Sequence, residues 1–151
     1  MIVRRVTERD REEFIRISES FYHSSAVLHP VPREYHAALF DEAMRSDAYT
    51  EAFLLEEEGR AVGFGVIAKT FSREAGGMVL WLEELFLCEN CRGRGYGRKF
   101  FDFIEKYARE KDFKRIRLEV EPENTRAQAL YERLGYQHLP YLQMVKEEGQ
   151  F

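Results

Sequence analysis

The adjacent glutamates Glu83 and Glu84 are candidates for chemistry because of their residue type and their position in the sequence. The two glutamates interrupt an apolar run, Met78 to Leu87, that otherwise has the pattern of a buried strand. Buried strands rarely carry adjacent carboxylates, because an ionised carboxylate loses its hydration there. Such a pair needs a reason, so Glu83 and Glu84 are candidate functional residues.

A glycine-rich loop follows this strand and precedes a helical pattern. Glycines let backbone N–H groups come close to a ligand, and the N–H groups at a helix start attract an anion. The common dinucleotide motif is excluded, because Arg98 stands where its third glycine would be, and the G-K-[ST] of the P-loop is missing. The loop therefore indicates a different phosphate or diphosphate site, and the alternative is a glycine-rich turn with surface arginines that only connects the strand to the helix. The candidate residues are Arg92, Gly93, Arg94, Gly95, Tyr96, Gly97 and Arg98.

Between the strand and the loop, Cys88 and Cys91 form a CxxC pair, a spacing found in redox dithiols and in halves of zinc sites. There is no second CxxC, and the closely spaced histidines His23 and His29 lie far upstream. A four-ligand zinc site would need an unusual long-range assembly. A redox or zinc module is therefore a minor alternative, and no metal is expected.

The composition is that of a packed globular protein. With 151 residues, of which 44% are hydrophobic, we expect one domain over 1–151. The 23 Lys and Arg against 27 Asp and Glu give a net charge of −4, the wrong sign for a protein that binds the nucleic-acid backbone. No run approaches the roughly 18 apolar residues of a membrane span, and the N-terminus lacks a signal-peptide stretch. We expect no membrane partner and a cytoplasmic location.

The hydrophobic pattern predicts strands and helices in mixed order. A strand and two helices come first, then strands joined by a turn at Glu58-Gly59, and then two helix–strand units, the second helix ending at Gly135. The expected strands include 2–6, 78–87, 115–121 and 142–145, and the expected helices begin after Thr7, near Pro32, near Gly95 and before Ala127. This order predicts an α/β (α+β) fold, a mixed sheet with helices on its faces.

The loop resembles the signature of the GCN5-related N-acetyltransferase (GNAT) family, Q/R-x-x-G-x-G/A, which residues 92–97 match in full. The resemblance continues at Leu85-Phe86-Leu87, at 121–124 and at 129–136, and thus covers about the C-terminal half. One departure is Glu89, where family members often have a proline. The resemblance implies a GNAT fold, a central mixed sheet of about six to seven strands with about four flanking helices.

For the acetyl donor, acetyl-CoA, the resemblance implies backbone contacts. The loop would bind the diphosphate, and Leu85, Phe86 and Leu87 would lie along the pantetheine arm. An N–H near Leu87 would polarise the acetyl carbonyl. Asn124 matches a cofactor-contacting asparagine. It could equally cap a helix, although a capping box between Thr125 and Gln128 would leave it available.

The resemblance also suggests an acid and a base. Strand alternation places Glu83 and Glu84 on opposite faces, so only one should reach the substrate. Glu83 is preferred, because 82–87 resembles diamine and polyamine acetyltransferases in which the first carboxylate is the base; the alternative is a solvated or salt-bridged pair. Tyr131 stands where the family places the acid that protonates the CoA thiolate, and the alternative is a core tyrosine.

Together these residues predict an acetyl-CoA-dependent N-acetyltransferase. The acetyl group would move to a primary amine by direct attack in a ternary complex. A small diamine or polyamine is one candidate acceptor, and an aminoglycoside, an amino acid and a protein N-terminus are the alternatives. A non-catalytic acyl-CoA sensor is the alternative from another class. The resemblance further suggests a homodimer, because members of this family often form one. The candidate apolar contacts are Tyr136, Tyr141 and Phe151.

Overall fold

The computed structural model describes residues 1–24 and 29–149. The chain divides into two compact units, Met1–Glu119 and the part that begins at Val120. Phe151, a candidate dimer contact, lies outside the described residues. The expectation of a single domain over 1–151 stays a prediction.

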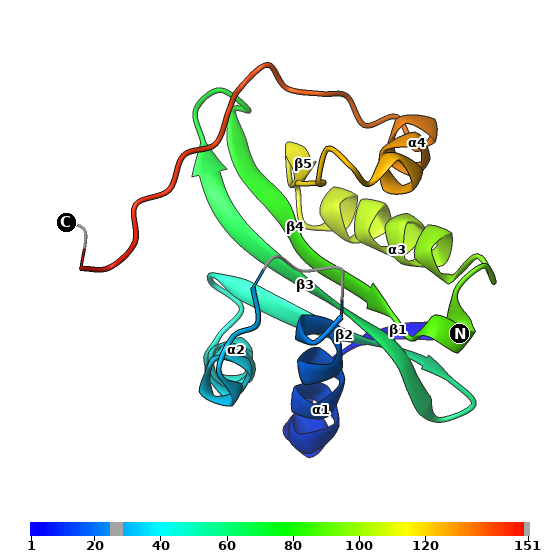
Figure 1. Cartoon of the computed structure of the whole chain (residues 1–151). Coiled ribbons are helices and arrows are strands. Elements are labelled where there is room, and N and C mark those ends of the chain that lie inside the picture. Colours follow the sequence, from blue (N-terminus) through cyan, green and yellow to red (C-terminus); the bar gives the residue numbers. More distant parts are fainter. Residues whose placement is uncertain (25–28, 150–151) are drawn as a thin grey trace. The chain divides into compact units, whose positions relative to one another are not determined.

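A mixed five-stranded sheet forms the centre of the first unit (Figure 1). Its order follows the chain, and the pairs are antiparallel except for the parallel pair of the last two strands. The predicted α/β class with a mixed sheet is confirmed. The strands are β1 (Ile2–Arg5), β2 (Thr50–Glu57), β3 (Arg60–Ser72), β4 (Gly77–Leu87) and β5 (Arg115–Leu118).

The turn between β2 and β3 confirms the predicted hairpin. Glu58 and Gly59 both have positive φ, 51° and 75°. A two-residue turn of this kind matches the right-handed twist of the strands that it joins.

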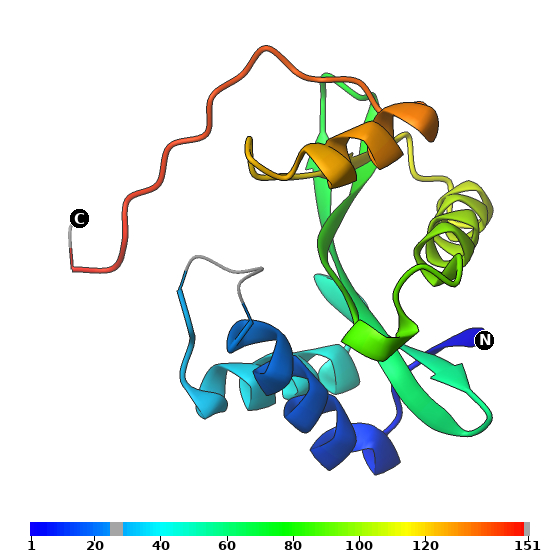
Figure 2. The ribbon, with the colours of Figure 1, turned by 45° about the vertical axis from the view of Figure 1, so that its right-hand side comes forward.

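Helices α1 (Arg11–Tyr22) and α2 (Arg33–Arg45) pack on one face of the sheet, and Figure 2 shows them side by side. A short 3-10 turn (Glu8–Asp10) precedes α1, and Thr7 forms a capping box with Asp10. No helix in the described ranges is long and apolar enough to cross a bilayer. The core between these helices and the sheet consists of Val6, Phe14, Ile17, Phe40, Ala43, Ala52, Leu54, Phe64, Val66 and Phe86.

Helix α3 (Tyr96–Glu110) packs on the opposite face. On β2, Leu54 belongs to the core under α1 and α2, while its neighbour Phe53 contacts Phe103 of α3 at 5.2 Å between ring centroids. Successive strand residues point to opposite faces, so the sheet separates the two helical layers. Gly65 of β3 lets the fully buried Phe100 of α3 come against the strand.

The second unit contains α4 (Thr125–Arg133). The helix is followed by Gly135 at φ 90°, which confirms the predicted stop. Asn124 is the N-cap, and its Oδ1 accepts a hydrogen bond from the backbone N–H of Ala127 at 3.1 Å. The predicted capping box is wrong, because Gln128 instead donates to backbone carbonyls of the preceding segment.

Two strand predictions are also wrong. The strand expected over 115–121 ends at Leu118, where its pairing with β4 stops. Residues 142–145 form no strand, because they pair with no other strand in the part of the chain that the structure describes. Among the described residues the sheet therefore has five strands rather than the expected six to seven, while the four α-helices agree with the prediction.

The contact between Gly65 and Phe100 gives a stability prediction. A Cβ at Gly65 would lie 2.3 Å from Cζ of Phe100, and this ring is fully buried. Gly65→Ala should therefore lower the free energy of unfolding by about 1–3 kcal/mol, measured by urea denaturation. Gly97→Ala is the matched control, since its Cβ would meet no heavy atom within 4 Å and alanine favours a helix. Equal stability of the two variants would contradict this account of the packing.

Candidate active site

Strands β4 and β5 part in the middle of β4. Their parallel pairing runs from Val79↔Arg115 to Leu82↔Leu118 and stops there, while β4 stays paired with β3 as far as Gly63↔Leu87. From Glu83 onward, the edge of β4 that faced β5 has no strand partner among the described residues. Backbone N–H and C=O groups along such an edge can pair with the amide groups of an extended ligand.

A β-bulge lies at the point where the strands part. Val66 of β3 pairs with Glu84 and Ile67 pairs with Leu82, so Glu83 is an extra residue with no Cα partner on β3. The bulge interrupts the alternation from which we expected the two carboxylates to lie on opposite faces. Val66 belongs to the core under α1 and α2, so its partner Glu84 also faces these helices.

Glu84 is largely enclosed and has a protein donor on one oxygen. The hydroxyl of Tyr22, the last residue of α1, donates to its Oε1 at 2.6 Å. Its Oε2 is buried and has no hydrogen-bond partner in the described ranges. Burial raises the pKa of Glu84, the bond from Tyr22 lowers this pKa, and the negative charge of Glu83 raises it further.

Glu83 is the solvent-exposed member of the pair. Partial desolvation raises its pKa, and the negative charge of Glu119 adds to the effect. Its own charge acts on both Glu84 and Tyr22, whose pKa values it raises. The two carboxylates and the phenol therefore form one electrostatically coupled group at the bulge.

The glycine loop connects the end of β4 to α3. A 3-10 turn (Glu89–Cys91) comes first, and Gly93 and Gly95 then adopt left-handed φ angles of 77° and 78°. Gly95 is the N-cap of α3, and the N–H groups of the first helical turn have no partner within the helix. A Cβ at Gly93, Gly95 or Gly97 would meet nothing within 4 Å, so the loop presents an open backbone surface. An anion fits such a helix start.

The arginines of the loop have different partners. Arg92 Nε donates to the carbonyl oxygen of Leu87 at 3.1 Å, which ties the loop to the end of β4. Arg98 pairs with Asp102 one helical turn later at 2.8 Å, and both side chains are exposed. The arginines therefore leave the glycine backbone uncovered.

Glu57, at the end of β2, holds the loop from the other side. It accepts a hydrogen bond from the hydroxyl of Tyr96, which is 5% exposed, and it pairs with Arg94 at 3.4 Å. Glu57 was not predicted from the sequence, because it stands in an acidic run with no motif around it. Only the folded hairpin brings it to the loop.

Three predicted cofactor residues lie on β4 beside the opening. Leu85 and Leu87 are half-buried, whereas the ring of Phe86 packs in the core against Phe21, with 5.4 Å between ring centroids. The side chain of Phe86 is therefore not available to a ligand. The structure thus brings residues 83–87 and the glycine loop together in the first unit.

Tyr131 and Asn124 belong to the second unit. Burial raises the pKa of Tyr131, so its phenol keeps its proton at neutral pH. Oδ1 of Asn124 serves as the cap of α4, which agrees with the alternative considered from the sequence. The catalytic role of Tyr131 and the cofactor role of Asn124 stay predictions.

The CxxC pair has free thiols. Cys91 is buried and Cys88 is half-buried, and desolvation raises the pKa of Cys88 above its usual range. A raised pKa reduces the thiolate fraction and with it the reactivity of the sulfur. Within residues 1–24 and 29–149, no group of three His, Cys, Asp or Glu side chains is arranged to hold a metal ion.

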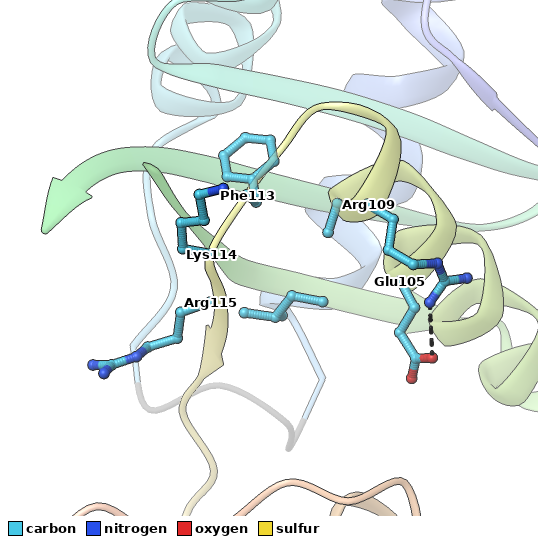
Figure 3. A pocket seen from close by; sticks show the side chains of 7 residues that line it. Glu105, Arg109, Phe113, Lys114 and Arg115 are labelled. Carbon is cyan, nitrogen blue, oxygen red and sulfur yellow. Dashed lines mark ion pairs between the residues drawn. The ribbon is translucent and has the colours of Figure 1, made fainter. Parts of the chain in front are cut away.

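A shallow depression of about 230 Å³ lies at the other end of α3 (Figure 3). Its lining includes Phe113, Lys114 and Arg115, and the ion pair of Arg109 with Glu105. The 15-residue helix places it about 20 Å from the glycine loop. The depression is therefore separate from the candidate active site.

A profile of the acetyltransferase (GNAT) family matches residues 11–136. The chain belongs to this family. It is thus an acetyltransferase, as the sequence predicted, and members of the family use acetyl-CoA as the donor.

Individual relatives agree with this assignment. The chain is 29% identical to the uncharacterized N-acetyltransferase YhfO of Bacillus subtilis over 67% of this chain and 68% of the relative. It is 35% identical to YjgM of Escherichia coli over 59% of this chain, and the match spans only 52% of that relative. It is 30% identical to the thialysine N-epsilon-acetyltransferase of Bos taurus over 66% of this chain and 65% of that enzyme.

Solved structures share the GNAT fold. An integron cassette protein from a salt-marsh metagenome has a TM-score of 0.83 at 19% identity, over 97% of this chain and 90% of its own. The aminoglycoside acetyltransferase AAC(6')-Iy, in complex with a CoA bisubstrate analogue, has a TM-score of 0.81 at 18% identity, over 97% of both chains. These structural similarities show that the chain has the GNAT fold.

The tie between Glu57 and Tyr96 gives a prediction for this acetyltransferase. Tyr96→Phe removes the hydroxyl that fixes the glycine loop to β2. Steady-state kinetics should show KM for acetyl-CoA raised roughly fivefold, with a smaller change in kcat, since one hydrogen bond to a charged group is lost. Tyr49→Phe is the control, because Tyr49 is 65% exposed and lies outside the loop. An unchanged KM in Tyr96→Phe would mean that Glu57 does not shape the donor site.

Proposed function

We propose that this chain is an acetyl-CoA-dependent N-acetyltransferase that acts on a primary amine by direct attack in a ternary complex. The observation that carries the proposal is the unpaired edge of β4, which begins at Glu83 and leads to the open glycine loop. A donor with an amide-containing arm and a diphosphate matches these two features. An acceptor amine would meet two carboxylates where the strands part.

The donor would be held through the backbone. The N–H groups at the start of α3, with Gly93, Gly95 and Gly97, would bind the diphosphate. The edge of Leu85 and Leu87 would pair with the pantetheine arm, and an N–H near Leu87 would stabilise negative charge on the acetyl oxygen. Arg92, Arg94 and Arg98 add positive charge near the diphosphate, and Asn124 is a further candidate contact.

Glu83 is the general base in this proposal. An alkylamine with a pKa near 10.4 is almost fully protonated at pH 7, so attack requires removal of a proton. The raised pKa of Glu83 makes it a better proton acceptor, and its exposure lets it return the proton to water. The amine nitrogen then attacks the acetyl carbon while the proton resides on Glu83.

Glu84 is the inner member of the pair and would hold the acceptor. Its buried Oε2 can accept an N–H of the amine, which would orient the nitrogen toward the donor. The anionic pair favours a cationic acceptor, and the diamine or polyamine expected from the sequence fits this charge. Relatives named for other amines, thialysine and aminoglycosides, widen the classes that a screen must include.

Tyr131 would complete the transfer as the general acid. When the C–N bond has formed and the C–S bond breaks, the CoA thiolate leaves and takes a proton from the phenol. The raised pKa of Tyr131 keeps this proton available. A homodimer and a cytoplasmic location, both expected from the sequence, stay predictions.

The proposal predicts amine-dependent release of the CoA thiol. A panel of diamines, polyamines, lysine-like amines, aminoglycosides and peptide N-termini should contain at least one acceptor, detected with a thiol reagent. Tyr131→Phe should bind CoA normally and lower kcat about 100-fold. Release with no panel member, despite measured CoA binding, would instead support the acyl-CoA sensor.

The two glutamates should have separable effects. Glu83→Gln should lower kcat about 100-fold and move the pH optimum upward, because more of the amine must then lose its proton to solvent. Glu84→Gln should mainly raise KM for the amine, because the acceptor loses a charged partner. Initial rates over a pH series would measure both effects. A larger loss of kcat in Glu84→Gln would exchange the two roles.

A further inference from the structure

The C-terminal end of α1 reaches the active-site carboxylates through one side chain. Tyr22 is the last residue of α1, and its hydroxyl lies 2.6 Å from Oε1 of Glu84, which is far away in sequence on β4. Burial and the neighbouring carboxylates raise the pKa of this phenol, so it stays protonated and donates. The bond is a charge-assisted one in a partly desolvated place, where such bonds are strong.

Aromatic rings from both helices hold the ring of Tyr22. Phe21 lies edge-on to it at 5.3 Å and His36 of α2 at 5.1 Å, measured between ring centroids. His36 is 2% exposed, and its Nδ1 is bonded to Ser18 Oγ of α1 at 2.8 Å. The ring of Tyr22 is thus held by a buried contact between α1 and α2, independently of its bond to Glu84.

The consequence for Glu84 is a fixed orientation. Because Tyr22 occupies Oε1, the carboxylate cannot rotate freely, and Oε2 is left buried without a donor in the described ranges. A buried, unpaired carboxylate oxygen is costly unless a ligand supplies a donor. An N–H of the acceptor amine is the donor that the proposed reaction brings to this place.

We propose that Tyr22 is a positioning residue that holds the carboxylate of Glu84 so that Oε2 receives the acceptor amine. This inference rests on the proposed function and adds a residue of α1 to the candidate site residues. Tyr22 acts through Glu84 and takes no proton from the substrate. Its loss should weaken acceptor binding more than it slows acetyl transfer.

In the described ranges, few groups besides Tyr22 influence the ionisation of Glu84. Glu83, next to it on β4, opposes its ionisation. From α2, His36 faces Tyr22, and burial lowers the pKa of His36, so its ring is neutral at neutral pH. From β3, the opposing residue is the apolar Val66. Within the described ranges, the hydroxyl of Tyr22 is therefore the neighbour that favours the ionised form of Glu84.

The test is Tyr22→Phe, which keeps the ring and its contacts and removes only the donor. KM for the amine acceptor found in the panel should rise about tenfold, with kcat and KM for acetyl-CoA nearly unchanged. Without the donor, the pKa of Glu84 rises, so the acidic limb of the pH profile of kcat/KM for the amine should move to higher pH. A packing role alone would not move this limb.

A double-mutant cycle with Glu84→Gln separates positioning from packing. In the Glu84→Gln background, adding Tyr22→Phe should change KM for the amine by less than about twofold. Tyr35→Phe is the control, since Tyr35 of α2 is 62% exposed and should leave KM unchanged. An equal penalty in both backgrounds, or an unmoved acidic limb, would overturn the inference. These outcomes leave wild-type thiol release intact, whereas its absence would reject the proposed function itself.

Discussion

The rest of the site depends on the point where β4 parts from β5. Up to Leu82 the two strands share a parallel ladder, and beyond it β4 is paired on one side only. The extra residue at Glu83 coincides with this point, and a bulge increases the local twist of a strand. The bulge, the start of the unpaired backbone edge and the two carboxylates therefore coincide at one point of β4.

The core on either side of the sheet keeps this irregularity in place. Beneath Glu84, Phe86 packs against Phe21 and Phe64, so β4 is anchored immediately after the bulge. On the opposite face, Phe100 packs against Gly65 and fixes α3, whose start is the proposed anion site. Such close packing resists small displacements. The edge of β4 and the start of α3 therefore keep fixed positions relative to each other.

The features that could be predicted well from the sequence depend on local patterns. The loop before α3 was predictable because glycines with positive φ and a helix start are encoded by adjacent residues. The hairpin at Glu58-Gly59 and the stop of α4 at Gly135 follow from the same kind of local signal. Two adjacent carboxylates within an apolar strand pattern likewise made Glu83 and Glu84 candidates, and their role stays a prediction.

What the sequence could not supply depends on contacts between distant segments. The bulge at Glu83 depends on the register of β3, and it interrupts the strict alternation that the sequence pattern predicted. The bonds of Tyr22 to Glu84 and of Tyr96 to Glu57 join residues that no motif connects. The strand expected at 142–145 had the right composition, but a strand forms only where a neighbour pairs with its backbone.

The division of the helices between two faces of one sheet has an evolutionary consequence. Glu84, expected to hold the acceptor, and its partner Tyr22 lie on the face of α1 and α2, whereas the helix start that would hold the donor belongs to α3 on the other face. Substitutions on α1 can therefore change which amine is bound, while the contacts to the donor stay the same. The choice of acceptor can therefore change readily during evolution, because the sheet separates the helices near the acceptor from the helix near the donor.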